Sequence, residues 1–204
     1  MIPAVLLAKD LGVGDLAEMN LMTGEHMTPE MLKINPWHQM PNMSDGDVHI
    51  AESGAIIRYI ANKYAPDKYG GTDWGTKATI DWAIDWANTN FSKNYGTIWY
   101  PTTGFGAPPE DQDEANKKAL ENLETFAAKF LCGPGKFIGG FSTPTIADYV
   151  CATRFHMCSH KAVNKVTGFE MPAKIKIYIL DFMTTVKSKD FLKAHDGFMD
   201  SKLA

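Results

Sequence analysis

Cysteine is scarce in this sequence of 204 residues, which contains only Cys132, Cys151 and Cys158. No two of them form a C-x-x-C pair, and an odd number of thiols cannot pair completely. A disulfide framework and a four-cysteine zinc site are therefore not expected, and a reducing compartment is favoured. The thiols also lack the local Cys–His pairing that is typical of an activated nucleophile.

Basic clusters and long apolar runs are absent as well. The formal net charge is −4 and no block of about five basic residues occurs, so nucleic acid is not an expected partner. The amino-terminal "MIPAVLLAKDLGVG" has no basic leader, and Lys9 and Asp10 interrupt its apolar run before the length that a membrane span requires. With 45% apolar and 22% charged residues, the composition indicates a soluble globular protein. We expect a cytoplasmic location and no membrane contact.

The first third of the chain mixes short elements of both kinds. Hydrophobic periodicity and turn residues predict helices over 4–11 and 28–35, a strand over 16–21, and two short strands in 40–43 and 48–51. Ser53 is a favourable N-cap for a helix whose apolar positions recur every four residues before Pro66. The order of elements is that of an α/β domain.

A break in this pattern follows the helix. The residues from 65 to 75 are rich in proline, glycine and aspartate and have no periodicity. We therefore expect a first domain over 1–66, a linker over 67–75 and a second domain over 76–204.

The second domain is predicted to be all-helical. From residue 76 to residue 100, apolar side chains recur every three or four positions and form one continuous face. Further helices are expected over 110–131 and over about 145–160, 172–187 and 189–195. In "TPTIADY", Thr145 as N-cap and Asp148 three residues later predict a capping box that fixes the start of a helix.

The stretch "NPWHQMPNMSDGDVHIAES", residues 35–53, concentrates polar groups directly ahead of a helix. A proline at position 41 makes a cis bond inexpensive and removes a ladder donor, so the backbone of Met40 can pair with an extended, peptide-like ligand. An edge-strand proline without a ligand explains the same residues. Both interpretations remain open on spacing alone.

The helix start at Glu52 and Ser53 is a second candidate. Unpaired N–H groups at a helix amino terminus suit a carboxylate or phosphate, and Glu52 beside them can bind an ammonium group. One α-amino acid headgroup carries both charges, although a plain capping role for Ser53 is the alternative. His26 and His38 flank the helix predicted over 28–35 and can bind a second carboxylate, whereas most isolated histidines have a plain surface or packing role.

Two pairs of residues at helical spacing were weighed and set aside. His156 and His160 can offer two nitrogens to zinc from one helix face, but neither an H-E-x-x-H motif nor a third ligand accompanies them. We expect no metal site. Trp82 and Trp86 have the same spacing and are interpreted as packing or interface residues.

Three stretches together resemble the cytosolic glutathione transferases, most closely the insect-type, theta-like branch that uses serine. They are "GEHMTPEMLKINPWHQMPNMSDGDVHIAESGAIIRYIANKY", "IDWANTNFSKNYG" and "STPTIADY". The resemblance covers nearly the whole chain. It implies a glutathione transferase fold, in which a thioredoxin-like α/β domain, here without its first strand, precedes an all-helical carboxy-terminal domain. It also implies a homodimer.

The resemblance further implies how glutathione, the cosubstrate, would be bound. The two histidines would approach its glycyl carboxylate, the backbone before a cis proline would pair with its cysteinyl unit, and the Glu-Ser pair would hold its γ-glutamyl end. The residues matched by position are His26, His38, Met40, Pro41, Glu52 and Ser53. An apolar electrophile would lie against the first long helix and the loop after it, at Phe91, Tyr95, Trp99 and Phe105. No metal is implied.

Two departures from the family pattern affect the expected chemistry. Gly54 stands where relatives of this branch usually carry a basic residue. The family's thiol-activating Ser, Tyr or Cys lies before the helix that begins here near Pro3, and only Met1 and Ile2 precede it, so no catalytic residue is assigned. Because the pKa of a free thiol is about 8.5, conjugation at neutral pH requires a group that stabilises the thiolate.

The missing strand also leaves an expected gap in the sheet, between the strands predicted at 16–21 and 40–43, where backbone groups need partners. Two functions follow as alternatives. The chain is either a transferase that conjugates the glutathione thiolate to hydrophobic electrophiles, or a noncatalytic binding or scaffolding module that keeps part of the glutathione site.

Overall fold

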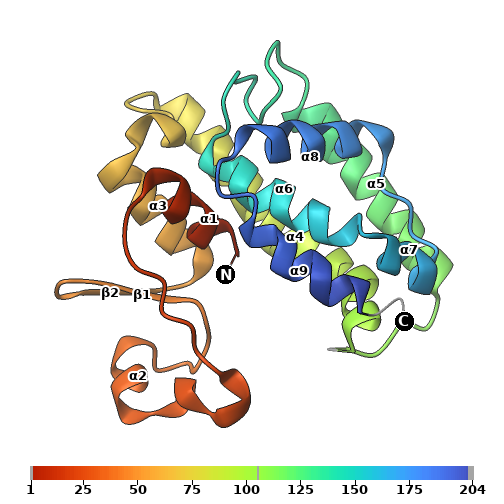
Figure 1. The fold of residues 1–204 in the computed structure, drawn as a ribbon. Coiled ribbons are helices and arrows are strands. Elements are labelled where there is room, and N and C mark those ends of the chain that lie inside the picture. Colours follow the sequence, from red (N-terminus) through yellow and green to blue (C-terminus); the bar gives the residue numbers. More distant parts are fainter. Residues whose placement is uncertain (1, 105, 202–204) are drawn as a thin grey trace.

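The computed structural model describes residues 2–104 and 106–201 (Figure 1). Its first elements are α1 (Ile2–Leu11), the 3-10 turns η1 (Leu21–Thr23) and η2 (Glu25–Met27), α2 (Pro29–Ile34), the strands β1 (Asn42–Asp45) and β2 (Val48–Ala51), α3 (Ser53–Tyr64) and η3 (Pro66–Tyr69). Six helices follow: α4 (Trp74–Thr103), α5 (Gln112–Phe130), α6 (Ile146–Cys158), α7 (Lys161–Thr167), α8 (Ala173–Thr185) and α9 (Phe191–Asp200). A small α/β part therefore precedes an all-helical part, as predicted.

The first helix, α1, packs against the helical part as well as against α3. Its apolar side chains Leu6 and Leu7 are completely buried. At its carboxy-terminal end, the Asp10 carboxylate accepts hydrogen bonds from the Tyr149 hydroxyl and from the Ser188 N–H, each at 2.6 Å. These contacts bind α1 to α6 and to the segment before α9, so α1 is shared between the two parts of the chain.

The strands β1 and β2 form an antiparallel hairpin in which Asp45 pairs with Val48 across Gly46 and Asp47. Gly46 has a positive φ of 59°, which a glycine adopts without steric cost. This hairpin and α2 project away from the helical bundle (Figure 1). The position of the hairpin agrees with the two short strands predicted from the sequence.

The prediction of a strand over 16–21 is wrong. Residues 15–20 have no regular structure, Leu16 is 45% exposed, and η1 begins at Leu21. A strand requires a neighbour for its backbone groups, and among the described residues β1 has only β2 as a partner. Without such a neighbour, the weak alternation in this segment is not sufficient to form a strand.

The start of α3 also differs from the prediction. Glu52, rather than Ser53, is the N-cap residue, and it has a positive φ of 70°. The Glu52 carbonyl accepts the N–H of Ile56 at 3.0 Å, so Ser53 already lies inside the first turn. This places the Ser53 N–H among the groups that the helix itself cannot satisfy.

The long helix α4 continues beyond residue 100, where the face predicted from the sequence ends, and includes Pro101. A proline inside a helix leaves the carbonyl four residues earlier without its usual donor. Here that carbonyl belongs to Thr97, and the side-chain amide of Gln112 donates to it at 3.2 Å. The helix ends two residues later at Thr103, where Gly104 follows with a φ of 80°.

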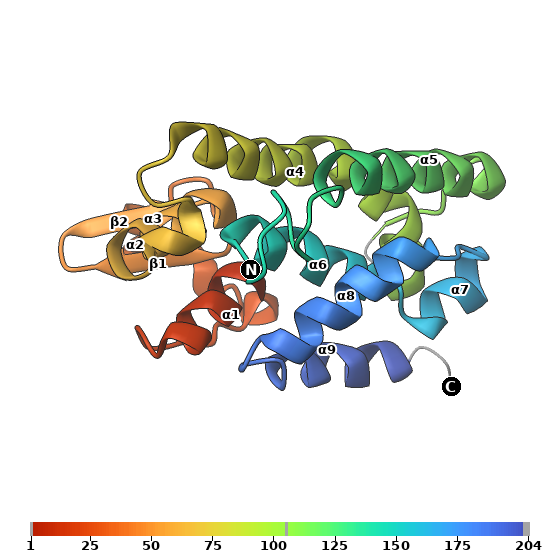
Figure 2. The same ribbon diagram turned by 90° about the horizontal axis from the view of Figure 1, so that it is seen from above.

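The central helix of the second part is α6, which lies between a layer of α4 and α5 and a layer of α8 and α9 (Figure 2). Aromatic side chains from three helices meet around it: the ring centroids of Phe91 and Phe155 are 5.0 Å apart, as are those of Phe126 and Phe155.

Among the helices that the structure describes, none has the length and apolarity to cross a membrane.

The predicted capping residue Asp148 organises the start of α6 from inside the core. Its carboxylate accepts hydrogen bonds from the Thr145 N–H at 2.7 Å, the Thr145 hydroxyl at 2.8 Å, the Ile138 N–H at 2.9 Å and the Tyr178 hydroxyl at 2.8 Å. Complete burial raises the pKa of Asp148 to about 6, and the four donors limit that rise because they favour the carboxylate. The capping box is thus also the link between the loop at Ile138 and α8.

Candidate functional site

A small polar cavity of about 130 Å³ lies at the start of α3, beside the beginning of β1. Four of the residues predicted to bind glutathione line it together: Met40, Pro41, Glu52 and Ser53. The Met40–Pro41 peptide bond is cis, as expected. The structure therefore brings the two candidate features of the sequence, the proline turn and the Glu-Ser helix start, to one place.

The amino terminus of α3 supplies the electrostatics of this cavity. The N–H groups of Ser53, Gly54 and Ala55 lie in the first turn and have no carbonyl partner within the helix. They carry the positive end of the helix dipole, and the Glu52 carboxylate lies next to them. A ligand that carries both a carboxylate and an ammonium group is complementary to this pair of charges.

The cavity also includes two residues that sequence reasoning missed, Asn35 and Gln39. The Asn35 side chain is buried and donates a hydrogen bond to the Gln39 carbonyl at 2.7 Å, while its oxygen accepts the Trp37 N–H at 3.1 Å. These bonds fix the loop that leads to the cis proline. The sequence signal was available, since Asn35 is the last residue of the helix predicted over 28–35 and precedes Pro36.

The structure also provides a physical reason for Gly54. A Cβ atom at this position would lie 3.2 Å from the Arg58 guanidinium and 3.2 Å from the Asn88 side-chain nitrogen. Arg58 is held there by Asp81 at 2.6 Å and Asp85 at 2.9 Å. A longer side chain at position 54 would displace this ion-pair network, which joins α3 to α4.

The two histidines are not among the residues that line the cavity. His26 is half-buried, and its Nδ1 atom makes no hydrogen bond among the described residues. His38 is exposed, has a positive φ of 59°, and its Nδ1 lies 2.9 Å from the Met27 sulfur. His26 is thus part of η2, and the His38 ring contacts its last residue, Met27. Their contact with the glycyl end of glutathione stays a prediction.

The residues predicted for the electrophile have different surroundings. Phe91 is fully buried in the aromatic core, a position that disfavours direct contact with a substrate. Tyr95 stacks on Trp99 with centroids 5.0 Å apart, and its hydroxyl donates to the Met157 sulfur at 3.4 Å. Phe105 lies outside the described residues. The structure therefore supports Tyr95 and Trp99 as an aromatic pair on α4, and their role stays a prediction.

A larger cavity of about 550 Å³ lies on the side of β1 that β2 does not cover. It is lined by residues of α1 and α3, by the irregular segment that includes Val13 to Ala17, and by β1 itself. The sequence predicts a gap between two strands, whereas here the cavity lies between β1 and irregular backbone, because residues 16–21 form no strand. The neighbouring segment turns away as irregular backbone instead of pairing with β1.

Comparison with known proteins agrees with this architecture. Residues 4–62 match the family model of the glutathione S-transferase amino-terminal domain. The chain is 31% identical to glutathione S-transferase theta-2B of Homo sapiens over 150 residues, which are 70% of this chain and 61% of that protein. It is 28% identical to glutathione S-transferase theta-1 of Mus musculus over 191 residues, 90% of this chain and 78% of that protein.

Residues 4–62 therefore form an amino-terminal domain of the glutathione S-transferase family. The apo structure of human glutathione-S-transferase T1-1 has the same fold, with a TM-score of 0.78 at 22% identity and coverage of 99% of this chain and 86% of that one. For four relatives of human and plant origin, the chain spans only 22% to 61% of their own length. The comparisons therefore establish the amino-terminal domain family and the fold, and the site and the activity are separate questions.

Proposed function

We propose that this chain binds glutathione in the small cavity at the start of α3 and adds its thiolate to apolar electrophiles. The observation that carries the proposal is that Met40, Glu52 and Ser53 line one polar cavity at a helix amino terminus. The backbone beside Pro41 is suited to the cysteinyl unit, and the charges at Glu52 and Ser53 are suited to the γ-glutamyl headgroup. The aromatic pair Tyr95 and Trp99 is the proposed contact for the electrophile.

Calorimetric titration with glutathione tests the binding. Glu52→Gln and Ser53→Ala remove a charge and a hydrogen bond, and a charge-assisted bond of about 1.5–3 kcal/mol corresponds to roughly a 10- to 100-fold weaker Kd. His49→Ala is the matched control, because His49 lies on β2, bonds Ser44 at 2.9 Å and lines neither cavity. His38→Ala tests the predicted glycyl contact. Absence of any heat at millimolar glutathione would contradict the proposal.

A noncatalytic glutathione-binding module is the second candidate. It is favoured by one observation: Ser53 is the only hydroxyl-bearing residue among those that line the small cavity, and it is already assigned to the γ-glutamyl end. In that case no second hydroxyl among the lining residues remains for the sulfur, and the bound thiol would keep a pKa of about 8.5, the value of the free group.

Two measurements separate the candidates. The ultraviolet absorbance of the thiolate, followed against pH with glutathione bound, reports the pKa of the thiol, and turnover with a dinitrohalobenzene reports conjugation. A lowered pKa together with turnover supports the transferase. Binding with an unchanged pKa and no turnover supports the noncatalytic module.

We also propose that the chain is a cytoplasmic homodimer with domains over 1–66 and 76–204. Trp74 and Trp82 on α4 are 80% and 53% exposed, and large exposed apolar side chains are typical of association surfaces. Light scattering on the purified chain gives the mass of the species in solution. The variant Trp82→Ala is expected to shift it toward the monomer, and an unchanged mass would exclude this tryptophan from the interface.

A further inference from the structure

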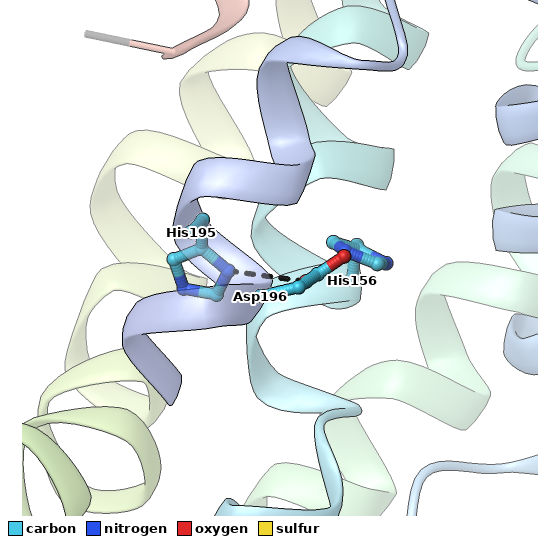
Figure 3. Close-up of side chains that lie close together, drawn as sticks. All are labelled: His156, His195 and Asp196. Carbon is cyan, nitrogen blue, oxygen red and sulfur yellow. Dashed lines mark hydrogen bonds and ion pairs between the residues drawn. The ribbon is translucent and has the colours of Figure 1, made fainter. Parts of the chain in front are cut away.

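A cluster of metal-ligating side chains lies between α6 and α9 (Figure 3). His156 comes from α6, and His195 and Asp196 come from α9. The Asp196 Oδ1 atom is 2.9 Å from His156 Nε2 and 3.5 Å from His195 Nδ1. All three ligand atoms lie within 4.8 Å of one another.

Sequence spacing does not predict this group. On spacing, His156 pairs with His160 on its own helix, whereas the packing of α9 brings Asp196 to it across 40 positions of the chain. In the structure α6 ends at Cys158, and His160, the N-cap of α7, faces Asp200 at the end of α9 at 3.6 Å. The expectation that no metal binds rested on the missing third ligand, and the fold supplies one.

The surroundings of the cluster suit a bound ion. The side chain of His195 is only 8% exposed, that of His156 18% and that of Asp196 35%. Within the part of the chain that the structure describes, the only partner of the His195 ring nitrogens is the Asp196 carboxylate, 3.5 Å from Nδ1, and neither nitrogen has a hydrogen bond of good geometry. A buried imidazole whose nitrogens are poorly hydrogen-bonded costs free energy, and coordination to a metal reduces that cost.

We propose that His156, His195 and Asp196 bind a divalent transition-metal ion of the zinc class. Zinc bonds to imidazole nitrogen and carboxylate oxygen are about 2.0–2.2 Å long, so two ligand atoms of a tetrahedral site are about 3.3 Å apart. The two separations at Asp196 lie on either side of this value, and the third separation, between the two histidine nitrogens, is no more than 4.8 Å. Three protein ligands leave the fourth position for water or a small anion.

Binding at this site connects α9 to α6 directly. In the structure, α9 meets α6 at the His156–Asp196 contact, and Trp99 of α4 stacks on His195 with ring centroids 5.9 Å apart. The ion would therefore hold the last helix against α4 and α6. This proposal is independent of glutathione binding, because none of its residues lines either cavity.

The test is a calorimetric titration of the untagged full chain with Zn²⁺, in a Cys132→Ser background because Cys132 is an exposed thiol that can bind zinc. We expect one ion per chain at micromolar Kd. His195→Gln and Asp196→Asn should each weaken zinc binding by more than roughly tenfold, which is the effect of changing a residue that only orients a metal ligand. Asp200→Asn is the matched control, since Asp200 lies on the same helix and faces His160 instead of the cluster.

Co²⁺ supplies a second readout that packing alone cannot mimic. A tetrahedral Co²⁺ site has intense visible absorption bands, which should appear with the parent chain and disappear with His156→Gln. If His195→Gln fails to fold by circular dichroism, the His156→Gln variant carries the same test. Absence of binding at millimolar Zn²⁺, or equal binding by His156→Gln and the parent chain, would overturn the proposal.

Discussion

The segment that carries the candidate glutathione site and the helix α6 differ strongly in how many of their residues are buried. Between Lys9 and Ser53, Asn35 is the only residue in the buried class among those whose exposure is described. In α6, ten of 13 residues are buried. The site is therefore assembled by local hydrogen bonds and by its two flanking helices, whereas the helical part has a continuous core. We expect the stability of the protein to reside in α4 to α8 and its adaptability near the cavity.

The largest effect is expected from the carboxylate at the centre of the helical part. Asp148→Asn leaves an amide facing four donors, and breaking such a buried polar network costs about 3–5 kcal/mol. Asp113→Asn, on the exposed start of α5, should change stability by no more than about 0.5 kcal/mol. Urea unfolding followed by circular dichroism measures both. Equal midpoints for the two variants would refute the central role of Asp148.

A pair of leucine truncations tests the contrast on either side of α1. Leu7→Ala opens a cavity at a fully buried position and is expected to cost about 2–5 kcal/mol. Leu16→Ala, in the irregular segment where the side chain is 45% exposed, should cost less than about 0.5 kcal/mol. The same unfolding experiment compares them. A large loss at Leu16 would show that this segment is more firmly packed than the structure indicates.

The connection between the two regions can be measured separately. Asp10→Asn weakens the bonds from Tyr149 and Ser188, and a double-mutant cycle with Tyr149→Phe should give a coupling energy of about 0.5–3 kcal/mol. The cycle isolates this one contact from the general effect of each change. A coupling near zero would mean that apolar packing alone holds α1 to α6.

The smallest effect concerns the hairpin. Hydrogen bonds from the Lys63 ammonium and then from the Tyr59 hydroxyl lower the pKa of Asp45 below its usual range. A carboxyl group with a lowered pKa stabilises the folded state above its ordinary pKa and loses that contribution as the pH falls. Amide exchange of β1 and β2 should therefore quicken, relative to α6, as the solution is acidified. Asp45→Asn should remove the difference, and a hairpin that stays equally protected would contradict this assignment.

The same contrast explains which features the sequence predicts. The face that runs from Ile80 to Ile98 has a helical period because those side chains meet one continuous core, and α4 forms where expected. Residues 16–21 depend on a strand neighbour that no local pattern can supply, and the prediction there fails. Pro101 is tolerated because of Gln112, a contact with another helix. The helix α7 has only seven residues, too few for hydrophobic periodicity to identify it as a helix.

The candidate site divides in the same way. Met40, Pro41, Glu52 and Ser53 are close in sequence, each has a local chemical rationale, and they do converge. Asn35 acts through the loop conformation that it stabilises, and His195 and Asp196 meet His156 only through the packing of the last helix. Contacts of the latter kind follow from the fold rather than from spacing.

The two hydrogen bonds at Asp10 have a consequence for dissecting the molecule. A fragment that ends at the linker would leave Leu6, Leu7 and the Asp10 carboxylate exposed, and the remaining fragment would leave Tyr149 and Ser188 without their acceptor. Each fragment thus carries the hydrogen-bonding partners that the other fragment lacks. Expressed as two separate polypeptides, they would have a defined surface on which to reassemble, which makes this chain suited to fragment complementation rather than to domain excision.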